Sequence, residues 1–383
     1  MVFLTVFLDL VGFGIVIPLL PLYAEAMGAG PVAATWLVAV YSLMQFFFAP
    51  WWGRVSDRVG RRPVLLVGLF GSAASSLLFG LAGSLPLLFA ARALNGFAGA
   101  NIGVAQAYVA DVTGPHERAR GMGLVGAALG LGFVFGPALG GVLSRWGHAA
   151  PFLGAAALAF LNGLWAVARL PESLPPERRS AAPAGLGLGE RLRTLFRGGG
   201  SERLRVLYAA GFLVTLGFAA MEGTFSLWAH ARWSLGREGI SFLFTWVGVV
   251  AALAQGFAVG RLVRRLGERR VVLAGLALLT AGLAGVALAP SLPLLAGALA
   301  VLALGYGTTS PSLSALISRQ GGPAEQGRVL GAYQSLSALG RVFGPVWGGV
   351  ALAHVGQSAP FLSGAGLAAA SLLLLALAMG GAP

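Results

Sequence analysis

The chain has 383 residues, of which 57% are hydrophobic and only 10% are charged. A soluble domain usually carries about 25% charged residues, so a soluble fold of this size could not cover its surface with polar side chains. The sequence contains no cysteine, which excludes disulfides, thiolate metal sites and cysteine nucleophiles.

The apolar residues gather into stretches of about twenty, the length a helix needs to cross a hydrocarbon core of about 30 Å. A transmembrane β-barrel would instead show segments of about ten residues that alternate apolar and polar, whereas these stretches are apolar on every face. We therefore predict twelve transmembrane helices, at residues 3–23, 33–52, 64–83, 86–109, 121–144, 150–169, 206–229, 239–260, 271–289, 293–317, 328–352 and 360–380.

The basic residues mark one side of the expected membrane. All 26 are arginine and the net charge is +13, which would also suit a nucleic-acid-binding protein. Outside the spans, most follow even-numbered helices, whereas Arg145, Arg232 and Arg237 follow odd-numbered ones. By the positive-inside rule, we expect the even-numbered loops and both termini in the cytoplasm of a multi-pass plasma-membrane protein. Topology and anionic lipid account for the basic charge, so no nucleic-acid partner is expected.

A long polar stretch separates two halves that repeat one pattern. It is rich in Pro, Gly and Arg and predicts a cytoplasmic linker at 171–205 between six-helix bundles at 1–170 and 206–383. The segment GRVSDRVGRR at 53–62 returns as GRLVRRLGER 207 positions later, and GFVFGPALGG at 132–141 returns as GRVFGPVWGG 208 positions later. Six helices is an even number, so the repeats are parallel. The expected fold class is all-α integral membrane, with twelve transmembrane helices in two pseudo-symmetric six-helix bundles.

These patterns resemble motifs of the major facilitator superfamily, and more narrowly of its drug:proton antiporter branch. The segment 53–63, GRVSDRVGRRP, is similar to the family's loop signature GxxxDRxGRR, and 132–141 resembles the GxxxGPxxGG motif of exporters. Asp9 followed by GFGIVIPLLP resembles the acidic first-helix motif of the branch. Arg92 and Asn95 resemble its RxxQG motif, with asparagine at the usual glutamine position. The resemblance implies the major facilitator fold and alternating access to a site near the bilayer midplane.

Within this branch, the first helix suggests the tetracycline exporters. That subfamily is expected to carry an acidic residue in helix 9, but residues 271–289 contain none. We therefore expect a multidrug or other amphipathic substrate.

Three ionisable residues within the spans are candidates for proton coupling, namely Asp9, Glu222 and Arg92. A carboxylate at membrane depth is costly unless it faces the bundle interior, so Asp9 is the leading candidate to load and release a proton. The alternative for Asp9 is a structural hydrogen bond with a helix backbone or with Arg92. For Glu222, proton or cation binding and a place at the outer interface are both open. The family motif implies that Arg92 lines the cavity and tunes the proton site.

Polar and aromatic side chains within the spans are candidates for substrate binding: Tyr41, Gln45, Asn95, Tyr108, Gln255 and Arg341. Aromatic faces attract organic cations, and a buried amide needs a hydrogen-bond partner. Most aromatics in membrane helices only pack or anchor at an interface. The sequence does not tell whether Arg341 faces a cavity or a neighbouring helix.

A cytoplasmic gate is predicted around the loop after helix 2, formed by Gly53, Asp57, Arg58, Gly60, Arg61, Arg62 and Asp111. We expect Gly53 to let two backbones touch, and Asp57 to accept hydrogen bonds from a neighbouring helix N-terminus. Arg58 and Arg61 are expected to pair with Asp111. The alternative is that these arginines only anchor the loop on the cytoplasmic side.

A helix-packing motif is predicted at Gly132, Gly136, Pro137, Gly140 and Gly141, with counterparts at Gly340, Gly344 and Pro345. The proline removes one backbone hydrogen bond and bends the helix, while the glycines leave one face bare. We expect this bare face to seat a helix from the other half of the molecule.

Together these features predict a proton-coupled secondary active transporter that exports amphipathic small molecules or drugs. The alternative is a proton-coupled symporter that imports a small nutrient or metabolite. A membrane enzyme is disfavoured because the spans contain no His or Cys and few acids, and a channel or signalling scaffold would lack gradient-driven counterflow. We expect no cofactor, no metal and a monomer, whose partners are the bilayer, protons and a small-molecule substrate.

Overall fold

The computed structural model describes residues 2–113, 118–179, 201–320 and 326–380. Within these ranges every regular element is a helix. Residues 180–200 of the expected linker lie outside the described residues.

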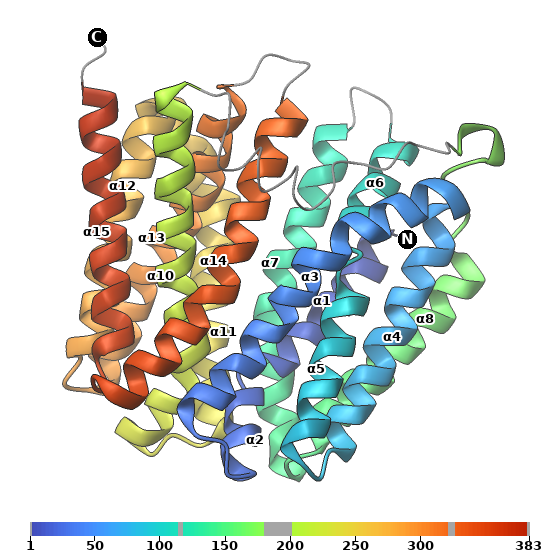
Figure 1. Cartoon of the computed structure of the whole chain (residues 1–383), viewed down its shortest axis with the longest axis horizontal. Helices are drawn as coiled ribbons and strands as arrows, with labels where there is room; N and C mark the ends of the chain where they lie inside the picture. The colour runs from blue at the N-terminus through green and yellow to red at the C-terminus, as the bar shows by residue number, and fades with distance from the viewer. Residues whose placement is uncertain (1, 114–117, 180–200, 321–325, 381–383) are drawn as a thin grey trace. The chain divides into compact units, whose positions relative to one another are not determined.

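The α-helices, which are labelled in Figure 1, follow the expected spans, two of which are divided. They are α1 (Val2–Val16), α2 (Leu20–Ala26), α3 (Pro31–Val59), α4 (Arg61–Leu81), α5 (Leu85–Gly99), α6 (Ile102–Val112), α7 (Arg118–Leu143), α8 (Ala150–Arg169), α10 (Glu202–Trp233), α11 (Arg237–Leu253), α12 (Gly260–Leu288), α13 (Leu292–Ser318), α14 (Gln326–His354) and α15 (Ala359–Gly380). The short elements are the 3-10 turns η1 (Ser144–Trp146) and η2 (Pro176–Arg178) and the π-helical stretch η3 (Ala254–Val259).

The described helices agree with twelve membrane spans. Eleven stretches are long and apolar enough to cross a membrane, and one of them, Arg237–Leu288, holds two spans. It is interrupted at Gly267, whose φ of 79° is left-handed, a conformation that glycine adopts without steric cost. Gly60 makes the corresponding turn between α3 and α4 with a φ of 108°. The two turns lie 207 positions apart, as the repeated loop motif requires.

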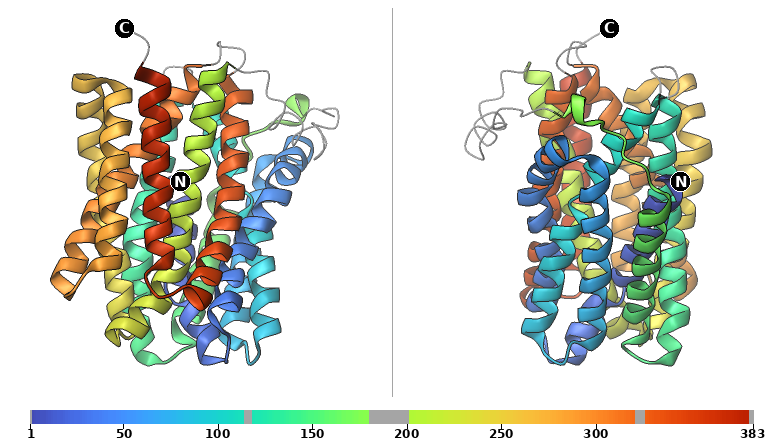
Figure 2. Two further views of the ribbon diagram at one scale, coloured as in Figure 1. Left: turned by 60° about the vertical axis from the view of Figure 1, so that its left-hand side comes forward. Right: turned by 90° about the vertical axis from the view of Figure 1, so that its right-hand side faces the viewer.

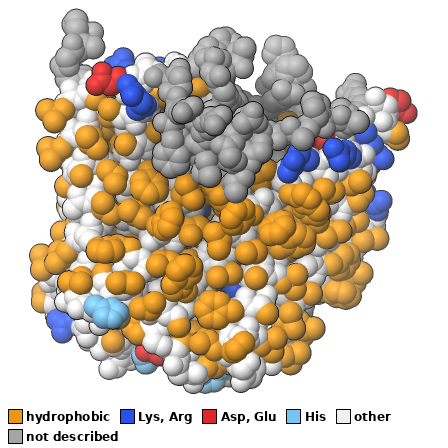
Figure 3. Space-filling model, in the orientation of Figure 1, with side chains coloured by type: hydrophobic (Ala, Val, Ile, Leu, Met, Phe, Trp, Pro, Cys, Tyr) orange, Lys and Arg blue, Asp and Glu red, His pale blue; other side chains and the backbone are white. Residues whose placement is uncertain are grey.

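Large apolar side chains face outward along these helices. Leu81, Leu161, Leu373 and Leu377 are 62–80% exposed. Figure 3 shows hydrophobic side chains over most of one face, with the arginines mainly toward its margins. Water disfavours such a surface strongly, whereas acyl chains do not. The outward faces of the helices therefore suit a bilayer.

Two of the expected spans are broken. The first divides into α1 and α2 at residues 17–19, where Pro18 lacks the N–H that would continue the helix. The fourth divides into α5 and α6 at Ala100 and Asn101. Asn101 packs so closely on α4 that a Cβ added to Gly68 would overlap its amide. Hydropathy shows neither break, because the spans stay apolar on both sides of it.

The chain divides into two compact units. Unit 1 comprises Met1–Gly185 and Ala229–Thr245, and unit 2 comprises Leu186–Trp228 and Trp246–Pro383. The end of α10 and the beginning of α11 thus group with unit 1, although they lie late in the chain. The contact of α11 with α7 accounts for this grouping, because a Cβ added to Gly141 would lie 2.9 Å from the Cβ of Ser241.

In unit 1, α1 packs against α7 and α8, α4 packs against α5 and α8, and α3 packs against α5. The long helices of the unit run alongside one another in both views of Figure 2. Their core buries Trp52, Tyr108 and Val125. This packing brings side chains from α1, α3, α4 and α5 together inside the unit.

The bare face of α7 seats α1, a helix of the same unit. Cβ atoms added to Gly132, Gly136 or Gly140 would each lie within 3.1 Å of an α1 atom, the closest being 2.6 Å from the Cα of Gly14. The expectation that these three glycines seat a helix from the other half is therefore wrong. The two helices approach this closely because Gly14 also lacks a side chain at the crossing. Only Gly141 of the motif faces α11.

Unit 2 repeats this packing between α14 and α10. Cβ atoms added to Gly340, Gly344 and Gly348 would lie 2.6–3.1 Å from α10 atoms, and one added to Gly223 would lie 2.8 Å from the Cβ of Pro345. The prolines of both motifs lie inside their helices. In the same unit α12 packs against α13 and α15. The sequence repeat thus corresponds to a repeated pair of closely packed helices.

Candidate functional site

Asp9 lies half-buried on α1 in unit 1. Its carboxylate accepts a hydrogen bond from the hydroxyl of Ser72 on α4, a residue that sequence reasoning did not identify. A hydroxyl can donate to a carboxylate and can accept from a protonated carboxyl group. The pair can therefore satisfy either protonation state of Asp9.

Arg92 on α5 is buried and held from several sides. Its Nε donates to the carbonyl oxygen of Leu37 at 3.2 Å, and its Nη1 donates to Oδ1 of Asn95 at 3.2 Å. The guanidinium also lies over the ring of Tyr41, 4.6 Å from the centroid, where the π-face attracts a cation. These contacts fix the Arg92 side chain between α3 and α5.

A chain of hydrogen bonds joins Arg92 to the serines of α4. Nδ2 of Asn95 donates to Oγ of Ser75 at 3.1 Å, and that hydroxyl donates to the carbonyl oxygen of Ser72 at 3.0 Å. Asparagine at this motif position thus uses both ends of its amide. We call the connected side chains the unit 1 network: Asp9, Ser72, Ser75, Asn95, Arg92, Tyr41 and Gln45.

Gln45 and Tyr41 form the α3 side of the unit 1 network. Nε2 of Gln45 donates to the Tyr41 hydroxyl at 3.0 Å and to the carbonyl oxygen of Gly99 at 3.1 Å. The ring of Phe13 on α1 lies 4.7 Å from that of Tyr41, measured between centroids. A Cβ added to Gly96 would lie 2.7 Å from the Tyr41 carbonyl oxygen. The glycines of the Arg92 motif therefore let α3 approach α5 closely enough for these contacts.

Tyr108 and Gln255 lie outside the unit 1 network. The Tyr108 side chain is 1% exposed in the core of unit 1, and its hydroxyl donates to the carbonyl oxygen of Pro171 at 2.8 Å. Gln255 is exposed on the π-helical stretch η3. Their substrate-binding roles stay predictions from sequence.

In unit 2, Glu222 and Arg341 lie near two tyrosines. The hydroxyl of Tyr306 on α13 interacts electrostatically with Tyr333 and Arg341 of α14 and with Glu222 of α10. Phe218, one turn before Glu222, stacks on Tyr306 with ring centroids 3.7 Å apart and ring planes at 11°. We call these five residues the unit 2 cluster.

Sequence reasoning missed three members of the unit 2 cluster, Phe218, Tyr306 and Tyr333. One signal was available, because residues four apart share a helix face and Phe218 precedes Glu222 by four. The tyrosines of α13 and α14 could not be paired with α10 from the sequence. Glu222 itself is half-buried and belongs to the cluster.

The loop after α3 is held by Glu172, another residue that the sequence did not reveal. Its Oε1 accepts from the backbone N–H of Arg61 at 2.8 Å, and its Oε2 accepts from that of Arg62 at 3.2 Å. Glu172 therefore caps α4, and the expectation that Asp57 accepts from a neighbouring helix N-terminus stays a prediction. A Cβ added to Gly60 would overlap the Glu172 carboxylate, so glycine permits both the left-handed turn and the close approach.

Arg61 joins the two acids expected in the gate. Its Nη1 pairs with Oδ1 of Asp57 at 2.5 Å, and its Nε lies 3.3 Å from Oδ2 of Asp111. The expected contact of Arg61 with Asp111 is thus present. Arg58, by contrast, is exposed, and no ion pair among the described residues includes it, so its expected pairing with Asp111 is wrong. We call Asp57, Arg61, Asp111 and Glu172 the Arg61 cluster.

Two further gate residues differ in their surroundings. Nη2 of Arg62 donates to the carbonyl oxygen of Val167 at 2.6 Å, near the C-terminus of α8, where a cation is favourable. Within the described part of the chain, no atom lies within 4 Å of a Cβ built on Gly53. The close backbone approach expected at Gly53 is therefore wrong. The packing of this α3 segment depends instead on Trp52, whose indole N–H donates to the carbonyl oxygen of Phe97 at 2.8 Å.

Two residues that follow the C-terminal end of α7 contact α11 within unit 1. Arg145 and Glu238 form an ion pair, with Nε 3.1 Å from Oε2. Nη2 of Arg237 lies 2.8 Å from Nε2 of His148, and guanidinium groups only donate, so this histidine nitrogen accepts. Partial burial and the charge of Arg237 lower the pKa of His148 below its usual value.

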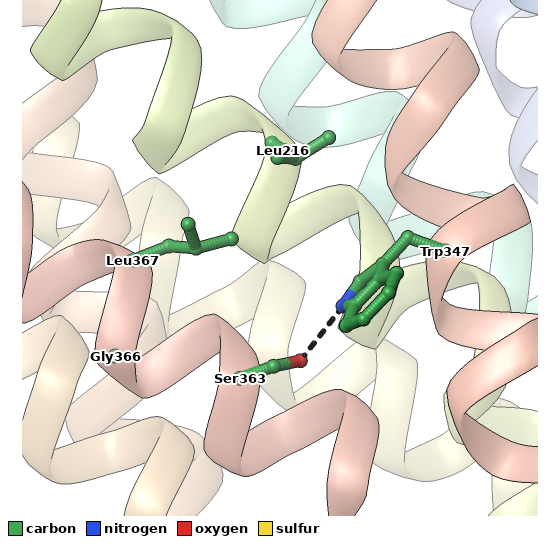
Figure 4. A pocket seen from close by; sticks show the side chains of 5 residues that line it. All are labelled: Leu216, Trp347, Ser363, Gly366 and Leu367. Atoms are coloured by element: carbon green, nitrogen blue, oxygen red, sulfur yellow. Dashed lines mark hydrogen bonds between the residues drawn. The ribbon is translucent and has the colours of Figure 1, made fainter. Parts of the chain in front are cut away.

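A small pocket in unit 2 is lined by Leu216, Trp347, Ser363, Gly366 and Leu367 and has a volume of about 250 Å³ (Figure 4). The Trp347 indole N–H donates to Oγ of Ser363 at 3.0 Å. Ligand pockets usually measure about 300–1,000 Å³ and offer several polar groups. This pocket therefore does not suit an amphipathic substrate. Among the described residues, no group of three or more His, Asp or Glu side chains could hold a metal ion.

Parallel repeats of six membrane spans, with ionisable groups inside each unit, define the architecture of a secondary transporter. The sequence matches the Major Facilitator Superfamily over residues 2–232 and again over 207–383, and the chain belongs to this family. Its members move small molecules across membranes, so this chain is a multi-pass membrane transporter and not an enzyme. The two matches correspond to the two repeats.

Several relatives are similar over nearly their full length. The chain is 35% identical to a class C tetracycline resistance protein of Escherichia coli, over 89% of this chain and 86% of the relative. It is 32% identical to multidrug resistance protein 2 of Bacillus subtilis, over 90% and 86%. The crystal structure of the human organic anion transporter MFSD10 (TETRAN) is 30% identical, with a TM-score of 0.74, over 98% of this chain and 97% of that one. These relatives support the drug:proton antiporter branch.

Proposed function

We propose that this transporter exchanges protons for amphipathic small molecules and exports them, with both termini in the cytoplasm. The observation that carries the proposal is Asp9, a carboxylate within a membrane span that meets the Ser72 hydroxyl inside unit 1. An ionisable residue within a membrane span is costly, which makes it a candidate for a functional site. Relatives named for resistance to tetracycline and to multiple drugs favour export.

In this proposal Asp9 loads a proton on one side of the membrane and releases it on the other. When Asp9 is ionised, Ser72 donates to it; when Asp9 is protonated, Ser72 accepts instead. Ser72 also belongs to the chain of contacts that holds Asn95 and Arg92. A change at Asp9 therefore alters the network that supports Tyr41, which with Gln45 contacts the substrate.

The Arg61 cluster closes the cytoplasmic side in this proposal. Arg61 joins Asp57 at the end of α3 to Asp111 at the end of α6, so the ion pairs hold two helix ends together. Closing and opening a gate requires contacts that form in one state and break in the other. Polar groups at a membrane surface meet this requirement because water replaces each lost partner.

The proposal is tested with purified protein in proteoliposomes that contain a pH-sensitive dye. We expect that adding a lipophilic drug drives proton movement against the drug flux, and that Asp9→Asn abolishes this movement. Glu25→Gln is the matched control, because Glu25 is exposed at the end of α2 and its variant should behave as the wild type. Proton flux that persists in Asp9→Asn would exclude Asp9 as the carrier.

The direction of coupling is read from the same vesicles. Export by antiport requires that proton and drug move in opposite directions, whereas the alternative, import of a nutrient by symport, requires the same direction.

For the gate, Asp57→Asn should lower transport without lowering the amount of inserted protein. Arg54→Gln is its control, because the Arg54 side chain is exposed and its Nε donates only within its own helix, to Pro50.

A further inference from the structure

The two arginines within the membrane spans are used in different ways. Arg92 is 3% exposed, and the Leu37 carbonyl oxygen and Oδ1 of Asn95 accept from its Nε and Nη1. Arg341 is half-exposed on α14. No hydrogen bond or ion pair between described residues includes Arg341, which interacts electrostatically with Tyr306 and Tyr333. Arg341 therefore has donors available, whereas Arg92 is committed to its own unit.

A guanidinium at membrane depth is costly unless an acceptor or water meets it. Its five N–H donors lie in one plane and match the paired oxygens of a carboxylate, sulfonate or phosphate. The hydroxyl of Tyr306, which interacts electrostatically with Arg341, can donate to the same anion. The surroundings of Arg341 thus favour an anionic group supplied from outside the protein.

An aromatic surface lies next to this guanidinium. Phe218 and Tyr306 stack with their ring planes at 11°, and both rings are only half-buried. Stacked rings of this kind present a flat apolar face to which another planar ring can add in an offset arrangement. Arg341 lies between two glycines of α14, Gly340 and Gly344, that pack on residues 215–220 of α10. Phe218 belongs to that stretch of α10, so the guanidinium and the ring pair lie at the same level of unit 2.

We propose that the unit 2 cluster binds organic anions that carry an acid group on a planar aromatic body, with the acid on Arg341 and the ring on the Phe218–Tyr306 pair. This inference deepens the proposed transport function and rests on it, because it names the class of solute that the transporter carries. Glu222 interacts electrostatically with the same Tyr306 hydroxyl. A proton on Glu222, or a cationic group on the same solute, would remove its repulsion of the anion.

The test is binding of three small probes to the purified full chain in detergent, by isothermal titration calorimetry. The probes are 2-naphthoate, its neutral analogue 2-naphthamide, and cyclohexanecarboxylate, which keeps the acid and lacks the aromatic ring. We expect Arg341→Gln to weaken naphthoate about tenfold or more, since a hydrogen bond to a charged group is lost, and to leave naphthamide within about twofold. Arg341→Lys should lie between, because lysine keeps the charge without the fork.

Arg270→Gln is the matched control, because it removes one positive charge from an exposed position of the same unit. It should bind all three probes as the wild type does. If Arg341→Gln does not fold, Phe218→Leu provides the test, since it should weaken naphthoate and spare cyclohexanecarboxylate.

Equal naphthoate affinity in the wild type and Arg341→Gln would overturn the inference, and so would an equal loss for naphthoate and naphthamide. A wild type that does not distinguish these two probes would overturn it as well. The proposed proton exchange is tested by a different measurement. Drug-driven proton flux that survives Asp9→Asn would contradict that proposal, but it would not affect the conclusion drawn from naphthoate binding.

Discussion

Replacing Glu172 by glutamine should loosen the beginning of α4. The carboxylate accepts the backbone N–H groups of Arg61, Arg62, Ser173 and Leu174 at 2.8–3.2 Å. It also places a negative charge at a helix N-terminus, where the dipole favours an anion. Glutamine keeps one acceptor oxygen and presents an NH₂ donor to the Arg62 N–H.

Glu172→Gln loses one hydrogen bond and the negative charge at the helix terminus, and these two losses set the size of the effect. One hydrogen bond contributes about 0.5–1.5 kcal/mol, and the charge at the helix terminus about 0.3–1 kcal/mol. Glu172→Gln should therefore lower the free energy of local opening by about 1–2.5 kcal/mol. Since 1.4 kcal/mol is a factor of about ten, amide exchange at the start of α4 should become roughly 5- to 60-fold faster.

Hydrogen–deuterium exchange followed by mass spectrometry on peptides that begin at Arg61 measures this effect. Glu177→Gln is the control, because Glu177 lies on the nearby turn η2 and is exposed. Exchange at the start of α4 that is equally fast in both variants, or unchanged in Glu172→Gln, would refute the role of Glu172 as the cap. Peptides from α13 should be unaffected in either variant.

Three further outcomes follow from packing, charge and hydrogen bonding. Gly136→Ala should lower the free energy of unfolding in detergent by about 1–3 kcal/mol, because its Cβ would lie 2.6 Å from an α1 backbone atom. Gly126→Ala is the control, since no neighbouring atom is found within 4 Å of its Cβ, and equal melting temperatures of the two variants would contradict the packing. Because the folded chain lowers the pKa of His148, its contact with Arg237 contributes stability above the usual histidine pKa. That contribution declines as pH falls from the usual histidine pKa toward the lower pKa of His148 in the folded chain. His148→Gln should therefore make the melting temperature less dependent on pH between pH 7 and about pH 5. A pH profile parallel to that of the wild type would count against the contact. Asn95→Leu should cost about 1–3 kcal/mol, since a buried Arg92 donor and Ser75 lose their partner; a melting temperature equal to the wild type would show that the amide is dispensable.

Much of the fold could be read from the chain because each span is a local property. A run of about twenty apolar residues must form a helix in a bilayer, since the helix satisfies every backbone polar group within the segment. The repeats at Gly60 and Gly267 specified the same left-handed turn twice, and the structure has both turns. Asp9 could be singled out because a charge in an apolar run is costly wherever the run packs.

The contacts between helices could not be read in this way. Glu172 is 111 positions from the N–H it caps at Arg61, and Tyr306 is 88 positions from the ring of Phe218 on which it stacks. No periodicity encodes such pairs, because they depend on which helix faces lie together after packing.

By itself the sequence determined the membrane class, the number of membrane spans, the repeat and the residue types available for proton and solute chemistry, because hydropathy and steric demands act on each segment separately. Only the tertiary structure decided that the α7 glycines seat α1, that Glu172 caps α4, and that Arg92 is engaged while Arg341 is available. These outcomes depend on close contacts between segments far apart in the chain, such as the 3.2 Å from Glu172 to the Arg62 N–H and from Arg92 Nε to the Leu37 carbonyl oxygen. Such distances are set by the packing of all helices together.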